Sequence, residues 1–156
     1  MIWIDTDMGF DDILAIMMIE ASPLEVAGIS LIFGNAPLDQ VRRNAAGAAA
    51  LLGWHFPVFT GARTSILGKV DTPGHVLGPK GIPTRGHGLP ECPPLTENPS
   101  LPALVNWLEQ LDGTGHILAL GPLTNLAILA LSRRGLSLRE TVIFHQVIMT
   151  TSSKPM

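Results

Sequence analysis

Short apolar segments alternate with helix-like segments along this 156-residue chain, and the alternation restricts the folds open to it. Segments rich in β-forming apolar residues predict strands at 2–5, 26–33, 57–60, 117–120 and 141–149. The stretches between them predict helices at 13–21, 38–52, 101–111 and 124–134. Because strands separated by helices are typical of βαβ units, we expect an α/β fold with a mainly parallel sheet flanked by helices.

Composition narrows the class of protein. The chain is 46% hydrophobic and 15% charged, which excludes an intrinsically disordered chain, and its length predicts a single domain over residues 1–156. The formal net charge of -3 argues against a nucleic-acid partner, whose phosphates require a basic surface. So small a charged fraction predicts that some apolar surface meets either another chain or parts of the protein that are absent from this sequence. Of these two, we expect a homo-oligomer.

The same sequence bears on the compartment. The N-terminus carries carboxylates where a signal peptide carries basic residues, and no apolar run is long enough to span a membrane. Cys92 is the only cysteine, so an intrachain disulfide is excluded and secretion is not indicated. We expect a cytoplasmic protein with no membrane partner.

Residues 61–99 are rich in proline and glycine and are predicted to form a long loop, a feature of functional or disordered segments. Two histidines in this loop, His75 and His87, are expected to face solvent and receive no role in a site. On the predicted helix 38–52, Arg42 and Arg43 are expected to lie on a solvated face.

Four carboxylates lie within eight residues after the first predicted strand, in the sequence DTDMGFDD at 5–12. Asp5 and Asp7 share a face if the strand continues, and Gly9 permits a turn that returns Asp11 and Asp12 to the same point. Clustered buried carboxylates must be protonated or balanced by a cation, and oxygen ligands suit Ca²⁺ or Mg²⁺. Helix capping would explain Asp11 or Asp12 but leaves the first two carboxylates without a reason.

This cluster and three later segments resemble the nucleoside hydrolases, the inosine–uridine-preferring family. DTDMGFDD is similar to the family's N-terminal signature DTDPGxDD, with Met8 in place of the proline. The later segments are FGN with the helix after it, PVFTGA at 57–62 and ALGPLTNLAILAL at 119–131. Four motifs in order make a specific match, and they imply a nucleoside-hydrolase (Rossmann-like) fold.

The resemblance implies an activity and a cofactor. In this family a water activated by Ca²⁺ hydrolyses the N-glycosidic bond of ribonucleosides and gives ribose and a free base. The matching Ca²⁺ ligands are the carboxylates of Asp7 and Asp12 and the main-chain carbonyl of Thr124. Asp7 would also be the catalytic base that takes the proton of the attacking water.

The resemblance also implies how a small-molecule ribonucleoside is held. Asp11 and Asn35 would bind the ribose hydroxyls, while Asp5 would support the carboxylate cluster. These roles place the substrate at the same end of the sheet as the cation. Nothing in the sequence indicates which nucleobase is preferred.

The resemblance covers only the N-terminal portion of the family domain, so we expect a truncated member. An Asn/Glu-containing ribose-binding segment and a C-terminal aspartate that completes the Ca²⁺ site have no counterpart here. The alternative is therefore a non-catalytic homologue that acts through self-association or a partner chain. A phosphatase of the haloacid dehalogenase type also has Asp-x-Asp after a strand, but it expects Thr or Val where Gly9 stands.

Overall fold

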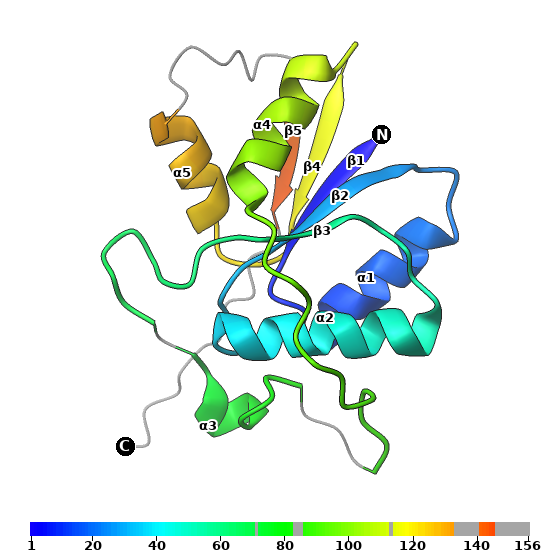
Figure 1. The fold of residues 1–156 in the computed structure, drawn as a ribbon, viewed down its shortest axis with the longest axis vertical. Coiled ribbons are helices and arrows are strands. Elements are labelled where there is room, and N and C mark those ends of the chain that lie inside the picture. Colours follow the sequence, from blue (N-terminus) through cyan, green and yellow to red (C-terminus); the bar gives the residue numbers. More distant parts are fainter. Residues whose placement is uncertain (71, 83–85, 113, 133–140, 146–156) are drawn as a thin grey trace, which may run out of the picture.

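The strands predicted from the sequence lie in one parallel sheet, in the order β3-β2-β1-β4-β5 (Figure 1). The structure is a computed structural model that describes residues 1–70, 72–82, 86–112, 114–132 and the backbone of 141–145. Its strands are β1 (Ile2–Thr6), β2 (Val26–Leu31), β3 (Val58–Thr60), β4 (Gly115–Ala119) and β5 (Thr141–His145). Its helices are α1 (Phe10–Glu20), α2 (Leu38–Leu52), α3 (Gly74–Leu77), α4 (Ser100–Gln110) and α5 (Thr124–Ser132). The predicted α/β fold is confirmed.

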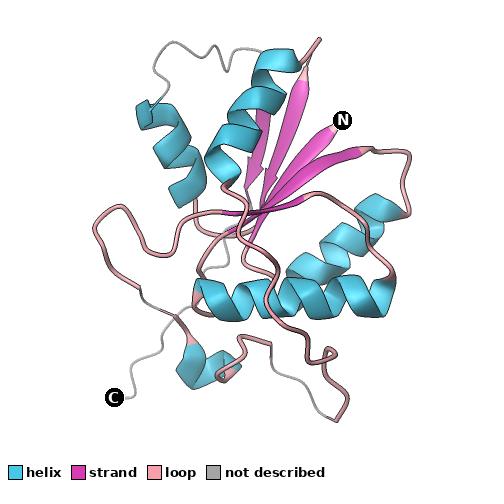
Figure 2. Ribbon diagram, viewed as in Figure 1, coloured by secondary structure: helices cyan, strands magenta, loops and turns pink. Residues whose placement is uncertain are grey.

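The helices cover both faces of the sheet, α1 and α2 on one and α4 and α5 on the other (Figures 1 and 2). Successive side chains of β1 point to opposite faces. Ile2 and Ile4 pack in the core beneath α1 and α2, whereas Trp3 packs among residues of α4 and α5. The indole ring of Trp3 lies 5.4 Å from the ring of Phe59 and 5.6 Å from that of Trp107. Each face therefore has its own apolar core.

The strand order creates a change of direction beside β1. The chain runs from β1 to β2 and β3 on one side, and then returns to place β4 and β5 on the other side. In open α/β sheets, ligands bind outside the carboxyl ends of the strands at such a point. The segments that leave β1 and β4 here are 7–9 and 120–123, which contain parts of two of the quoted motifs.

Some predicted bounds change. The predicted strand 26–33 ends at Leu31, and the segment between β3 and α4 includes the short helix α3. Residues 133–134 of a predicted helix and 146–149 of a predicted strand lie outside the described residues. Within the described ranges, no helix is both long and apolar enough to cross a membrane.

The expectation of a solvated Arg42 is wrong. Its side chain is buried, and its guanidinium group pairs with the carboxylates of Asp39 at 3.1 Å and Glu97 at 2.9 Å. The same two carboxylates also pair with Arg63. The end of the long loop packs back over α2 and encloses Arg42, while its neighbour Arg43 stays exposed as predicted. This four-residue ionic cluster connects the start of α2 with both ends of the loop.

Arg42→Ala should destabilise the chain by about 1–3 kcal/mol, because it removes charge-assisted hydrogen bonds and leaves buried space. Arg43→Ala, at the next position, should change the free energy of unfolding by less than about 0.5 kcal/mol because that side chain is exposed. Urea unfolding of both variants checks this. Equal effects of the two substitutions would contradict the role assigned to the buried arginine.

Candidate active site

The last residues of β1 are held between the segments that follow β2 and β4. The amide N–H of Ile32 donates to the Thr6 carbonyl over 3.0 Å, and that of Leu120 donates to the Asp5 carbonyl over 2.7 Å. Gly121 packs so closely on Asp7 that a Cβ at position 121 would lie 3.1 Å from the Asp7 amide nitrogen. The predicted acidic segment and the GPLTN segment therefore meet at the carboxyl edge of the sheet.

The turn that returns the carboxylates does not use the conformational freedom of Gly9, contrary to the prediction from the sequence. Met8 takes the left-handed conformation, with φ of 52°, whereas Gly9 has φ of -69°. Gly9 is required for space instead, because a Cβ there would overlap the side-chain amide of Asn35 and lie 2.9 Å from the Asp11 carboxylate. The left-handed residue is buried, so packing and the turn's hydrogen bonds maintain a backbone that is uncommon outside glycine.

Asp12 closes this turn. The Thr6 hydroxyl donates to Oδ2 of Asp12 over 2.6 Å, and the Gly9 amide donates to the same oxygen over 3.3 Å. Thr6 in turn accepts the Met8 amide over 2.9 Å. Asp12 is thus a buried carboxylate at the start of α1, turned back toward the end of β1.

Asn35 binds Asp7 through both main chain and side chain. Its amide N–H donates to Oδ2 of Asp7 over 2.7 Å, and its side-chain Nδ2 donates to Oδ1 over 3.2 Å. The preceding residue, Gly34, leaves no room for a Cβ against the Asp7 carboxylate. The FGN segment after β2 therefore fixes the orientation of the predicted catalytic base.

The Asp7 and Asp12 carboxyl groups lie together in a poorly solvated place. Burial, and then the charge and hydrogen bonding of Asp12, raise the pKa of Asp7 to about 8. Burial is also the main reason that the pKa of Asp12 is raised. Without a cation, the pair would hold a proton near neutral pH. A cation in place of the shared proton would balance the two charges.

Asp5 lies deeper than the other carboxylates and is fully buried. Its Oδ1 accepts hydrogen bonds from the Ser30 hydroxyl and from Nδ2 of Asn125, the latter at 2.7 Å, while its Oδ2 has no hydrogen-bond partner among the described residues. Burial raises the pKa of Asp5 to about 6, and the two hydrogen bonds limit the rise. Asp5 therefore contacts β2 and α5, which fits the supporting position predicted for it.

The two remaining predicted site residues, Asp11 and Thr124, lie at the starts of helices α1 and α5. Asp11 is exposed in the first turn of α1, and its charge contributes to the raised pKa of Asp7. Thr124 is the first residue of α5 and is buried. It also borders an open hollow of about 580 Å³ between residues 62–66 and α5. The structure thus brings Asp5, Asp7, Asp11, Asp12 and Asn35 to one edge of the sheet, with Thr124 in the segment that packs on Asp7.

Sequence reasoning missed three polar residues that hold this cluster: Thr6, Ser30 and Asn125. Asn125 belongs to the quoted GPLTN segment, so its place beside Thr124 was the available signal. Ser30 had a weaker signal, a hydroxyl inside an apolar strand. The loop histidines, His75 and His87, are exposed as expected.

The residues present suit a hard cation by their chemistry. Asp7 and Asp12 are two buried carboxylates whose like charges repel each other, and they supply the anionic oxygens that Ca²⁺ prefers. Among the described residues, no group of three or more His, Cys, Asp or Glu side chains is placed to hold a metal. Asp7, Asp12 and the Thr124 carbonyl make up only part of the expected ligand set, since the family's C-terminal aspartate has no counterpart in this sequence, so Ca²⁺ binding stays a prediction.

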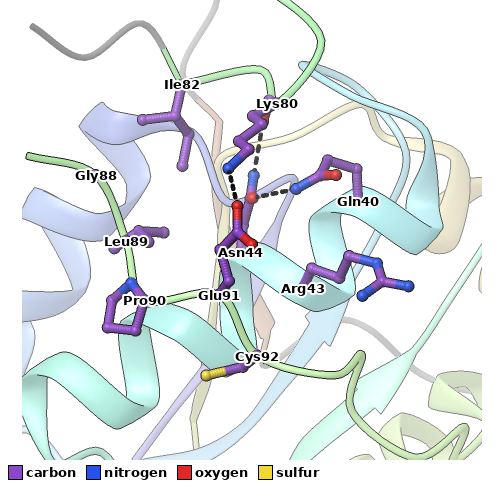
Figure 3. A pocket seen from close by; sticks show the side chains of 10 residues that line it. All are labelled: Gln40, Arg43, Asn44, Lys80, Ile82, Gly88, Leu89, Pro90, Glu91 and Cys92. Carbon is purple, nitrogen blue, oxygen red and sulfur yellow. Dashed lines mark hydrogen bonds and ion pairs between the residues drawn. The ribbon is translucent and has the colours of Figure 1, made fainter.

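Another cavity, of about 230 Å³, lies away from these carboxylates, between α2 and residues 80–82 and 88–92 (Figure 3). Inside it, Nδ2 of Asn44 donates to the Lys80 carbonyl over 2.9 Å, and the Lys80 ammonium pairs with Glu91 at 2.9 Å. These polar groups satisfy one another, and none of the predicted site residues lines the cavity. We therefore place the candidate site at the sheet edge.

Comparisons with known proteins identify the fold and the family. Two solved structures share the nucleoside-hydrolase fold: an inosine-guanosine nucleoside hydrolase (TM-score 0.74, 27% identity) and a purine-preferring ribonucleoside hydrolase from Gardnerella vaginalis (TM-score 0.79, 24% identity). The alignments cover 91% and 92% of this chain, and 48% and 47% of those chains. The second, at this identity, supports the fold alone.

The family model described as inosine-uridine preferring nucleoside hydrolase matches residues 2–146, and the chain belongs to this family. It is 35% identical over 131 residues to uridine nucleosidase 1 of Arabidopsis thaliana, and 28% identical over 130 residues to the pyrimidine-specific ribonucleoside hydrolase RihB of Escherichia coli. Each alignment covers 80% of this chain, but only 38% and 40% of the relatives. The chain thus spans about two fifths of the length of these curated relatives.

The raised pKa values predict how stability depends on pH when a chelator removes divalent cations. The folded state binds protons that the unfolded state releases, so the free energy of unfolding should fall from about pH 4 to about pH 8. For Asp5 alone, the rise in pKa from 3.8 to about 6 corresponds to about 3 kcal/mol, or about 10 °C in Tm.

Thermal unfolding across this pH range provides the measurement. The Asp7→Asn variant should show a shallower decline, because one of the titrating groups is gone. A Tm that rises with pH in the presence of chelator would show that the carboxylates are not protonated in the folded chain.

Proposed function

We propose that this site serves the hydrolysis of the N-glycosidic bond of ribonucleosides, with Asp7 as the catalytic base and Ca²⁺ as the cofactor. The observation that carries the proposal is the contact between two buried carboxylates, Asp7 and Asp12, at the edge where an α/β sheet binds ligands. Family membership supports the same reaction class. Because the relatives are longer, the activity of the whole protein is part of the proposal.

Asp7, Asp12 and the main-chain carbonyl of Thr124 would hold the cation. When bound, Ca²⁺ would polarise a water molecule and make its proton easier to remove. Asp7 would accept that proton, and the two hydrogen bonds from Asn35 that fix its carboxylate support this role. Water would then attack the anomeric carbon as the bond to the base breaks.

The ribose would lie between Asp11 and Asn35. The Asp11 carboxylate is exposed at the start of α1, so both of its oxygens can accept hydrogen bonds from sugar hydroxyls. Nδ2 of the Asn35 side chain donates a hydrogen bond to Asp7, and no described residue donates to its Oδ1. This oxygen could therefore accept a hydrogen bond from a second ribose hydroxyl. Negative charge from Asp7 and Asp11 would also stabilise positive charge that develops on the ribose ring.

Asp7→Asn should lower the turnover of inosine or uridine by about 100-fold or more, because the amide cannot accept the proton of the attacking water. Release of free base in the presence of Ca²⁺ provides the measurement. Asp112→Asn, an exposed carboxylate in the turn after α4, is the matched control and should retain wild-type turnover. Full activity of Asp7→Asn would exclude the catalytic role, and inactivity of the wild-type chain would exclude turnover by this chain alone.

Self-association, the non-catalytic alternative, has one specific observation in its favour. The exposed side chains of Phe10, Leu14, Met17 and Met18 recur at helical spacing on α1 and form an apolar stripe. A second copy of this chain would cover such a stripe. The homo-oligomer, the cytoplasmic location and the absence of a nucleic-acid partner all stay predictions.

Sedimentation velocity tests the stripe. The wild-type chain should sediment as an assembly, and Met18→Glu should shift it toward the monomer because a charge would be buried at the contact. Leu67→Glu is the control, since Leu67 is 83% exposed and lies outside α1. A monomeric wild-type chain would count against self-association and against the expected homo-oligomer.

A further inference from the structure

Asn125, the second residue of α5, forms hydrogen bonds with residues at the carboxyl ends of three strands, β1, β2 and β3. Its Nδ2 donates to Oδ1 of Asp5 over 2.7 Å and to the Leu31 carbonyl over 3.4 Å. Its Oδ1 accepts the amide N–H of Ala62 over 2.8 Å. Asp5 lies near the end of β1, Leu31 ends β2 and Ala62 follows β3, so one buried amide side chain joins α5 to three neighbouring strands.

The surroundings are shaped for an amide. Gly61 packs against Asn125 so closely that a Cβ at position 61 would overlap the side-chain amide. The group must donate toward Asp5 and accept from Ala62 at the same time. A carboxylate could accept from Ala62 but would face the Asp5 carboxylate, and a short hydroxyl could not reach both partners.

The segment 120–125 is consequently attached to Asp5 at both of its ends. At the first end, the amides of Leu120 and Gly121 donate to the main-chain carbonyl of Asp5 over 2.7 and 3.3 Å. At the second end, the Asn125 side chain donates to the carboxylate of the same residue. Between these attachments lies the turn that leads into α5.

The Thr124 carbonyl shares a planar peptide unit with the nitrogen and Cα of Asn125, so its location follows from where Asn125 is held. We propose that Asn125 is a positioning residue that sets the Thr124 carbonyl opposite the Asp7–Asp12 pair. The inference rests on the proposed function, which assigns that carbonyl to the cation. Asn125 itself binds neither cation nor substrate.

The first experiment follows amide hydrogen exchange in the Ca²⁺-free chain. Asn125→Ala should speed exchange at Ala62 and across 120–127, because the hydrogen bonds that hold this segment are lost. Ser30→Ala is the matched control: it also removes a buried donor to Asp5 but leaves Asn125 in place, and it should not speed exchange in 120–127. Unchanged exchange in Asn125→Ala would overturn the inference.

The second experiment titrates CaCl₂ into each chain by calorimetry. Asn125→Ala should bind Ca²⁺ about 10-fold or more weakly, the usual effect of losing a group that orients a ligand. Asn106→Ala, an exposed asparagine on α4, should bind as the wild type does. A purely structural role would lower Tm but leave the Ca²⁺ affinity of the folded chain unchanged, and that result would overturn the inference.

Two further outcomes can be distinguished: a variant that does not fold, and a wild-type chain that binds no Ca²⁺. If Asn125→Ala does not fold, Asn125→Ser, which can keep one of the hydrogen bonds, takes its place in both experiments with the same expected directions. If the wild-type chain binds no Ca²⁺, the proposed cofactor and the calcium part of this inference are both wrong. The exchange result then still decides whether Asn125 holds the 120–127 segment.

Discussion

The burial of three carboxylates at and just after the end of β1 is the constraint to which the rest of the site conforms. Asp5, Asp7 and Asp12 are all removed from water, and for each of them burial is the first cause of a raised pKa. The surrounding groups reduce this penalty by donating hydrogen bonds, as Thr6 does to Asp12 and Asn35 to Asp7. A bound cation would offset the remaining negative charge, so the property that makes these buried carboxylates costly also favours the proposed cofactor.

Much of the fold could be predicted because it depends on local patterns. Apolar runs such as 26–33 predict buried strands, and the carboxylates at 5–12 stand out against the apolar segments on either side. The strand order could not be predicted, since nothing in the local sequence says that β4 pairs with β1. The burial of Arg42 was missed for the same reason, because its partner Glu97 is distant in sequence and approaches only when the loop folds back.

In the site too, local sequence indicated some residues, whereas others could be identified only from contacts between distant parts of the chain. Its charged residues were identified from one short segment and a family resemblance, whereas the groups that hold them come from other elements. Asn125 lies 120 residues from Asp5, and Ser30 contacts that same carboxylate from β2. The backbone of the turn also differed from expectation: Met8 takes the left-handed conformation, and Gly9 supplies only space. Carboxylates that could act in catalysis or bind a metal can be recognised in a sequence. The residues that hydrogen-bond to them, such as Ser30 and Asn125, can be recognised only when the positions of the strands are known.

The order of strands in the sheet has a consequence for synthesis on the ribosome. β1, β2 and β3 are made first and can pair with one another, but β1 then keeps one open edge until β4 emerges. Over that interval the nascent chain presents unpaired backbone groups beside the growing cluster of carboxylates, an arrangement prone to misassembly. Insertion of β4 closes this edge and delivers Asn125 to Asp5 in the same event. The pairing of β4 with β1 and the contact of Asn125 with Asp5 are therefore linked, because both depend on the same segment of the chain.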